Sequence, residues 1–307
     1  MVKRGDTGNQ VKYLQEMLNR FVNTQLTVDG DFGPGTERVL AKAQKTLGRE
    51  VRSEVTSEVW NILKNTFLRF DAQFSTTPLV PQNLLEVPPN RQKIPLVKGW
   101  NQYGQLISQI ARKQGIPVST ALAVLAIESD SEAYGWKNKP VIRFENHVFW
   151  RHWGRRFAST FHDHFKFEQG RSWEGHMWRP SPGDPWQKQH TRDKNQEREW
   201  RVLTFARTLD DTAALCSTSW GAPQVMGFNH RKIGYGTPQE MVEAFQKDAR
   251  WQVLGLFDFF QDDARMLPAL RKGDFVTFAR IYNGKGQAEN YGAQIKASAG
   301  LAVKMGF

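Results

Sequence analysis

A chain of 307 residues has the length of two domains and can bury a sizeable core, and its 11 Trp and 20 Phe exclude a disordered chain. The formal net charge is +11, of which residues 1–65 carry +2 and residues 66–307 carry +9. Such a basic surface suits nucleic acid, anionic lipid or a carboxylate-rich polymer, and charge alone does not choose among these partners.

The cysteine content and the N-terminal residues indicate the compartment in which the chain is made. Cys216 is the only cysteine, so neither an intramolecular disulfide nor a cysteine metal cluster can form, which fits synthesis in a reducing cytoplasm. Residues 1–10, MVKRGDTGNQ, lack the apolar stretch of a signal peptide, and no apolar run reaches the ~18 residues of a membrane span. We therefore expect no signal peptide and no transmembrane helix.

The first 65 residues contain a duplicated pattern. A Gly/Asp turn at 4–11 leads into an amphipathic helix, a second turn at 28–36 leads into another, and residues 56–63 should form a third helix. The doublet of Gly-Asp-x-Gly-x-x-Val and Asp-Gly-x-Phe-Gly-x-x-Thr resembles a peptidoglycan-binding type 1 domain. The alternative is a generic helical cap on a second domain, but Gly and Asp recur at matching places in both halves.

This resemblance implies domain boundaries and binding residues. Residues 1–66 would form a small three-helix peptidoglycan-binding domain, and its binding residues would be those of the second turn: Asp29, Gly30, Phe32 and Gly33. Residues 67–98 carry five prolines and little periodicity, so we expect a semi-rigid linker there. Residues 99–307 would then form a larger catalytic domain.

Helical patterns dominate the second part of the chain. The predicted helices are residues 100–114, 119–128, 198–209, 238–260 as one or two helices, 274–282 and 288–303. Residues 141–150, VIRFENHVFW, read as a short β-prone stretch that enters a helix. No run of alternating strands would support a sizeable sheet, so the fold class is predicted to be mainly α.

The helix at 119–128, STALAVLAIE, is the strongest candidate for chemistry. It is apolar nearly all round, as a buried core helix is, and Glu128 is its only charge. Apolar neighbours and the negative end of the helix dipole both disfavour the charged carboxylate, so the pKa of Glu128 should be raised. A carboxyl that stays protonated near neutrality can donate a proton as a general acid. The alternative is that Glu128 merely ends the helix in solvent.

Four motifs in order give this helix a family context. Glu128-Ser129 is followed by RFENHVF at 143–149, SWGAPQVMGFN at 219–229 and IYNG at 281–284. The first, third and fourth resemble the motifs of the lysozyme superfamily that includes goose-type lysozymes and lytic transglycosylases. With RFENHVF between them, residues 99–307 resemble the N-acetylmuramidase domain of modular phage endolysins, an α-helical lysozyme-like fold.

The resemblance assigns roles to residues outside the first motif. Trp220 and Gly221 would form the wall of the cleft, where a glycine permits close backbone approach and a Trp face can pack on a sugar ring. Gln224 would bind substrate by hydrogen bonds, Tyr282 would line the site near the acid, and Asn283 would fix the turn.

Glycoside hydrolysis usually requires a second carboxylate beside the acid. Glu145 lies 17 residues after Glu128, which is enough chain for a turn and a return to the same cleft, so we predict it as the second catalytic group. Its alternative role is a salt bridge with Arg143, and Asp130 or Glu132 could serve in its place.

Histidine and tryptophan residues between 147 and 207 suggest two further functions, metal binding and nucleic-acid binding. His152, His162, His164 and His176 suggest zinc, but their spacing matches no usual metal motif, so we predict no metal and no cofactor. Basic residues interleaved with Trp suit nucleic acid and sugar rings equally, and no nucleic-acid signature is present, so no nucleic-acid partner is predicted.

The resulting hypothesis is a peptidoglycan hydrolase that cleaves the β-1,4 bond between N-acetylmuramic acid and N-acetylglucosamine. A lytic transglycosylase, which forms 1,6-anhydro ends, is the nearest alternative, and a non-catalytic wall-binding virion protein is the other. We expect a monomer that is made in the host cytoplasm and acts on periplasmic peptidoglycan after release. An anionic outer-membrane surface is a second partner that its positive charge would suit.

Overall fold

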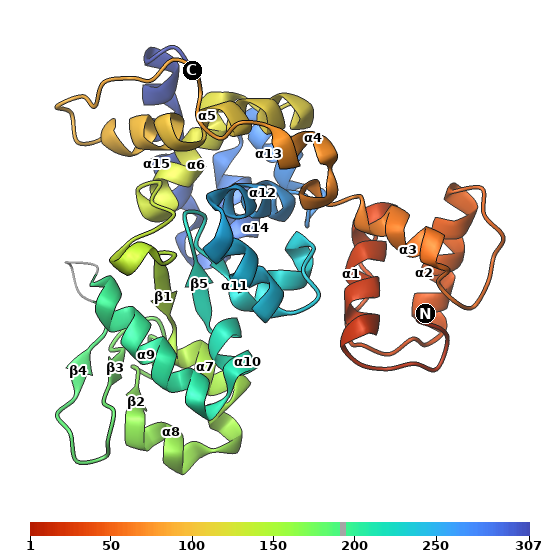
Figure 1. Ribbon diagram of the computed structural model, residues 1–307, viewed down its shortest axis with the longest axis horizontal. Coiled ribbons are helices and arrows are strands. Elements are labelled where there is room, and N and C mark those ends of the chain that lie inside the picture. The colour runs from red at the N-terminus through yellow and green to blue at the C-terminus, as the bar shows by residue number, and fades with distance from the viewer. Residues whose placement is uncertain (191–194) are drawn as a thin grey trace.

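The computed structural model describes residues 1–190 and 195–307 and is mainly helical, as predicted (Figure 1). The α-helices are α1 (Asn9–Val22), α2 (Pro34–Thr46), α3 (Ser57–Lys64), α4 (Ala72–Thr76), α5 (Ile94–Gln114), α6 (Val118–Ser129), α7 (Asn146–His152), α8 (Ala158–His164), α9 (Gln196–Leu209), α10 (Asp211–Cys216), α11 (Pro238–Lys247), α12 (Ala249–Phe259), α13 (Met266–Lys272), α14 (Phe275–Tyr282) and α15 (Ala288–Lys304). The strands are β1 (Ile142–Phe144), β2 (Phe165–Lys166), β3 (Met177–Trp178), β4 (Gln187–Lys188), β5 (Thr218–Trp220) and β6 (Val225–Met226). Short 3-10 helices are η1 (Leu68–Phe70), η2 (Trp136–Asn138), η3 (Gly154–Arg156), η4 (Gly227–Ile233) and η5 (Lys285–Gln287).

The N-terminal module consists of α1, α2 and α3 around its own apolar core. Gln15 of α1 orders the second Gly/Asp turn, because its Nε2 donates to Asp29 Oδ1 at 2.8 Å and its Oε1 accepts from Gly30 N at 2.9 Å. Phe32 of the same turn is 1% exposed and packs in this core. The Thr56 side chain caps α3 by accepting from Val59 N, so the third predicted helix begins where the sequence indicates.

The range predicted as a linker, residues 67–98, holds η1, α4 and the first turn of α5. Leu68 and Phe74 are buried and belong to the core of the following domain, 5% and 0% exposed respectively. The start of this segment is therefore helical and packed rather than extended. Burial of the Leu68 and Phe74 side chains removes apolar surface from water, which stabilises the packed arrangement.

Two lobes make up the rest of the chain. The upper lobe in Figure 1 is helical, and α6 lies at its centre against α5 and α15. Residues 121–125 of α6 are at most 1% exposed, which explains why that helix is apolar all round.

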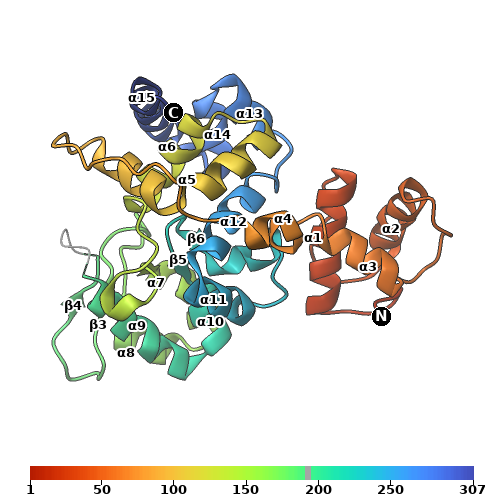
Figure 2. The ribbon, with the colours of Figure 1, turned by 45° about the horizontal axis from the view of Figure 1, so that its top comes forward.

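The lower lobe contains α7–α11 (Figure 2) and two small antiparallel sheets, ordered β1-β5-β6 and β2-β3-β4. Ile142 pairs with Trp220, and Phe144 pairs with Thr218. Each strand has only two or three residues, so the sequence carries no long alternating run that could have predicted these sheets. An aromatic core, which includes Phe144, Phe149 and Phe165, fills this lobe.

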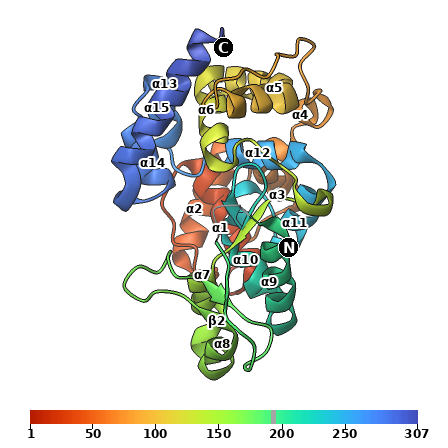
Figure 3. The ribbon, with the colours of Figure 1, turned by 90° about the vertical axis from the view of Figure 1, so that its left-hand side faces the viewer.

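The module contacts the upper lobe through a buried ion pair. Arg20 Nη2 lies 2.5 Å from Asp258 Oδ1, and the two side chains are 7% and 1% exposed. Asp258 Oδ1 also accepts from Leu68 N at 3.0 Å, and Tyr13 of α1 donates to Gly234 O at 2.9 Å. In Figure 3 the module lies behind the two lobes. These bonds dock the module on α12 and η4.

Among the described residues, no helix combines the length and the apolar character that crossing a membrane requires.

Candidate active site

A cleft of about 220 Å³ separates the two lobes beside the C-terminal end of α6. Glu128 lines it from the upper lobe. The other lining residues come from the segment after α6 and from the lower lobe: Glu132, Gly135, Val141, Ile142, Arg143, His190, Gln196, Glu199 and Gln224. The cleft is therefore rich in carboxyl and amide groups, which suits a polyhydroxylated ligand.

Glu128 occupies the position that the sequence predicted, at the end of the apolar helix. The helix stops there because Asp130 adopts a left-handed conformation with φ of 55°. Burial raises the pKa of the Glu128 carboxyl to about 7, against the opposing effect of a hydrogen bond from Tyr291. This upward shift of the pKa agrees with the expectation from the apolar neighbours of Glu128. The protonated carboxyl is therefore populated near neutral pH.

Tyr291 is a site residue that the sequence reasoning missed. Its hydroxyl donates to Glu128 Oε1, and its ring stacks on Tyr282 at a centroid distance of 6.4 Å. Asn283 is exposed at the end of α14, directly after Tyr282. Tyr282 donates to Pro223 O at 3.4 Å and is partly buried. The Tyr-Asn-Gly motif thus lies behind Glu128 and reaches it through Tyr291.

Gln224 lines the cleft, whereas Gly221 is buried beside it and is not one of the lining residues. Gly221 has φ of +68°, and a Cβ there would lie 2.2 Å from Gln252 Oε1. Gln224 lines the cleft, but its amide is already used within the chain: Nε2 donates to Gly221 O at 2.8 Å, and Oε1 accepts from Ser219 Oγ at 2.8 Å. Gln224 therefore holds the loop and offers the cleft only its remaining hydrogen-bonding capacity.

We expect Gly221→Ala to destabilise the chain by about 2–5 kcal/mol, because the left-handed backbone disfavours a side chain and the new methyl overlaps Gln252. Chemical denaturation of the full chain measures this loss. Gly183→Ala is the matched control, since a Cβ at Gly183 meets nothing within 4 Å. Equal stability of the two variants would contradict the prediction.

Trp220 does not take the position that its predicted role requires. Its side chain is 0% exposed, its Nε1 donates to Leu215 O at 3.2 Å, and its ring packs edge-on against Trp200. All three residues of β5 are buried, and the indole of Trp220 packs in the core of the lower lobe, so it offers no face to a sugar. The motif alone does not reveal this position, because Trp is common both in protein cores and on sugar-binding surfaces.

Glu145 lies outside the set of residues that line the cleft. It directly precedes α7, and its side chain is 13% exposed. Arg143 Nε donates to Glu145 Oε1 at 2.8 Å, so the salt bridge that the sequence left open as the alternative role of Glu145 is present. Around the second carboxylate oxygen lie His147 and His176, each with Nδ1 at 3.5 Å. Burial raises the pKa of Glu145 to about 7.

Two other carboxylates do line the cleft with Glu128. Glu132 forms a salt bridge with Lys98 at 2.9 Å and is about half exposed. Glu199 is 5% exposed, and its Oε2 accepts from Phe144 N at 2.9 Å. Burial raises the pKa of Glu199 to about 7. Glu199 was missed from the sequence because it lies 71 positions beyond Glu128 on an ordinary amphipathic helix.

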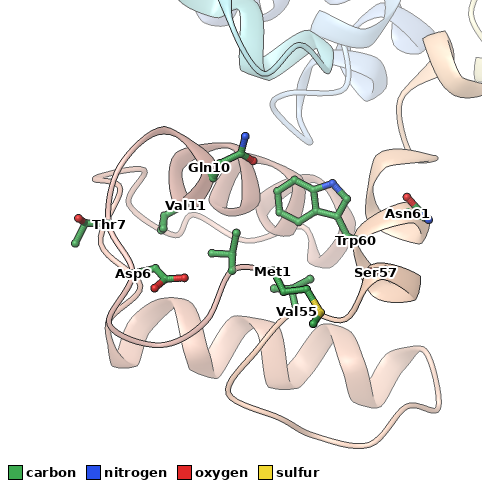
Figure 4. A pocket seen from close by; sticks show the side chains of 10 residues that line it. Met1, Asp6, Thr7, Gln10, Val11, Val55, Ser57, Trp60 and Asn61 are labelled. Carbon is green, nitrogen blue, oxygen red and sulfur yellow. The ribbon is translucent and has the colours of Figure 1, made fainter.

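The N-terminal module has a cavity of its own, of about 590 Å³. Figure 4 shows Met1, Val55 and Trp60 around it, with Gln10 and Thr7 at its edge. None of the four residues predicted for binding, the turn residues between 29 and 33, lines this cavity. Asp29 and Gly30 bond to Gln15, Phe32 is in the core, and Gly33 caps α2.

Comparisons with known proteins agree with this architecture. The family model of N-acetylmuramidase matches residues 117–300, and the model of a peptidoglycan-binding domain matches residues 7–63. No curated protein matches the chain significantly. Among solved structures, the Burkholderia AP3 phage endolysin has a similar fold, with 22% identity, 99% of each chain covered and a TM-score of 0.51. Since the N-acetylmuramidase model covers more than half of the sequence, the chain belongs to the N-acetylmuramidase family and is a glycoside hydrolase of peptidoglycan, as its motifs predict.

Proposed function

We propose that this muramidase is an endolysin that cleaves the β-1,4 bond between N-acetylmuramic acid and N-acetylglucosamine with Glu128 as the general acid. The observation that supports the role of Glu128 is its position: a partly buried carboxyl at the end of α6, on the cleft, with one oxygen held by Tyr291. The solved structure of similar fold is itself a phage endolysin.

In the proposed reaction, protonated Glu128 donates its proton to the glycosidic oxygen. The bond from that oxygen to C1 of N-acetylmuramic acid breaks through an oxocarbenium-like state, and water adds to C1. The proton that the water loses passes to a second carboxylate. No cofactor enters these steps.

The identity of the second carboxylate stays a prediction. Glu145 is the residue predicted from the sequence, and Glu132 and Glu199 line the cleft with Glu128. Glu145→Gln, Glu132→Gln and Glu199→Gln separate the three. Substitution of the carboxylate that positions the water should lower turnover strongly. The pH at which Glu128 titrates should stay unchanged.

Mass spectrometry of digested peptidoglycan tests the reaction and separates it from its alternatives. Reducing N-acetylmuramic ends are the expected product. 1,6-Anhydro ends would identify a lytic transglycosylase, in which the 6-hydroxyl of the sugar replaces water and Glu128 also acts as the base. Absence of soluble fragments would leave only a wall-binding protein.

Tyr291→Phe should move the alkaline limit of activity to higher pH. The hydroxyl of Tyr291 donates to Glu128 Oε1 and so favours the ionised carboxylate, which lowers the pKa of Glu128. Since the acid form is required, wild-type turnover should fall as the pH rises through about 7, the raised pKa of Glu128. Without the hydroxyl that pKa rises further, and the fall in turnover occurs at higher pH.

The pH–rate profile of Tyr134→Phe provides the control, because that hydroxyl donates to Phe245 O at 3.1 Å, away from Glu128. A Tyr291→Phe profile that coincides with wild type, or that shifts to lower pH, would show that Glu128 does not set the alkaline limit.

The module is proposed to hold the wall while the cleft cuts it, and Trp60 in its cavity offers an aromatic surface for a sugar. We further propose that the protein is a monomer, made in the host cytoplasm and active on periplasmic peptidoglycan after release. Loss of binding to purified sacculi in Trp60→Ala, with folding intact, would support the cavity over the turn residues such as Asp29.

A further inference from the structure

A cluster of histidines around Glu145 lies beside the cleft and has no part in proton donation by Glu128. Ligand atoms of Glu145, His176 and His190 all lie within 4.8 Å of one another. They come from three separate segments, because Glu145 precedes α7, His176 precedes β3 and His190 follows β4. The rings of His176 and His190 are 4.4 Å apart.

Backbone carbonyls fix the tautomers of the two imidazoles. His176 Nε2 lies 2.9 Å from Ser172 O, and His190 Nε2 lies 3.0 Å from Phe144 O. A carbonyl oxygen only accepts, so each Nε2 carries the hydrogen and each Nδ1 carries a lone pair. Donation of one ring N–H to a carbonyl is the arrangement that orients a metal-binding histidine.

The lone pair of His176 Nδ1 accepts a long bond from Asn146 N at 3.4 Å, and it also faces a buried carboxylate oxygen with no hydrogen between the two atoms. Glu145 Oε2 lies 3.5 Å from His176 Nδ1, and the His176 side chain is 0% exposed. Glu145 Oε2 is buried and finds no hydrogen-bond partner among the described residues, and the same holds for His147 Nδ1, 3.5 Å away. Buried polar atoms without partners cost free energy, and a cation among these atoms would satisfy them.

We propose that Glu145, His176 and His190 bind a Zn²⁺ ion. Two imidazole nitrogens and one carboxylate oxygen are ligands that zinc prefers, and the fourth position remains for water or for His147. With zinc–ligand distances of about 2.0–2.2 Å, the ligand atoms of a tetrahedral site lie ~3.4 Å apart. That separation is close to the 3.5 Å between Glu145 Oε2 and His176 Nδ1.

One side chain must move to admit the ion, and the long bond from Asn146 N to His176 Nδ1 must be given up. Arg143 Nη2 donates to His190 Nδ1 at 3.1 Å, so the guanidinium occupies the lone pair that zinc would use. The Arg143 side chain is 48% exposed, and solvent is open to it. Zn²⁺ would then take the place of the Arg143 guanidinium as the positive charge opposite Glu145.

The ion would connect the β2-β3-β4 sheet to the start of α7, next to the cleft that His190 and Arg143 line. This gives Glu145 a role different from the second carboxylate predicted from the sequence. It also departs from the sequence prediction of no metal, because the ligands lie on three segments and form no spaced motif.

Retention of zinc by the full chain, purified without a histidine tag, tests the site. The protein is stripped with a chelator, equilibrated with ZnCl₂, desalted and analysed by elemental mass spectrometry. We expect one equivalent of zinc in wild type and a loss of more than about tenfold in affinity in His176→Asn and in His190→Asn. His162→Asn, an exposed histidine outside the cluster, is the matched control and should retain the ion.

Measurements on wild type keep the proposal testable if a variant fails to fold. Zinc should slow hydrogen exchange of residues 165–178, and Co²⁺ should give the visible absorption bands of imidazole coordination. Wild type that retains no more zinc than the His176→Asn/His190→Asn double variant, with unchanged exchange, would overturn the site. Digestion of peptidoglycan by such zinc-free protein would leave the proposed function standing, and Glu128→Gln should lose digestion while it keeps zinc.

Discussion

Glu128→Gln is expected to lower peptidoglycan digestion by ~10²–10⁴-fold while folding and wall binding remain intact. The amide keeps the size of the side chain and can still accept the hydrogen bond from Tyr291. It cannot give up a proton to the glycosidic oxygen, so the leaving group departs without general-acid assistance. Turbidity clearance and release of reducing ends measure the loss, and a sacculus pull-down measures binding.

Glu243→Gln is the matched control, because Glu243 is exposed on α11, outside the set that lines the cleft. It should clear walls at the wild-type rate. If Glu128→Gln retained more than a tenth of wild-type clearance, Glu128 would not be the acid, and the assignment of the first motif would fall with it.

Asp258→Ala should destabilise the chain by about 3–5 kcal/mol, because it leaves the guanidinium of Arg20 buried without its partner. Burial raises the pKa of Asp258 and lowers that of Arg20, so desolvation opposes both charges and the pair itself contributes little net stability. Removal of one charge exposes the full cost of burying the other. The Leu68 amide also loses its acceptor.

Chemical denaturation compares this variant with Arg201→Ala, which breaks an exposed pair with Glu197 and should cost at most about 0.5 kcal/mol. The double variant Arg20→Met/Asp258→Leu should recover part of the loss, since both charges leave together. Asp258→Ala that unfolds like Arg201→Ala would mean that the module does not rely on this ion pair.

The helices of this protein could be predicted because their signals are local. The helix with Glu128 was found from an apolar run that stops at one charge, and its observed end at Ser129 lies one residue further. Thr56 and the residues after it likewise predicted α3 within one position at each end. The two small sheets could not be predicted, since strands of two or three residues depend on partners far away, such as Thr218 for Phe144.

The site was only partly predictable for the same reason. Glu128 carries a local signal, whereas Tyr291 reaches it across 163 positions from a helix of small residues. Trp220 has the residue type that binds sugars, but the pairing of β5 with β1 turns it into the core. The ligands around Glu145 form a group only after three segments are folded together. Residue type and order identified the family, and long-range packing decided which members of each motif face the cleft.

The buried contact between Arg20 and Asp258 has a consequence for how the enzyme works on an intact wall. A module on a flexible tether would let the cutting lobe sample any strand within the reach of its linker. Here the cavity around Trp60 and the carboxyl of Glu128 keep a constant offset and orientation, because the module is bonded to α12. The module would then bind one glycan strand while the cleft cleaves another, and only where the spacing of the two strands in the mesh matches that offset. Stretching or cross-linking the mesh should therefore alter its rate on whole sacculi without altering its rate on short, free glycan chains.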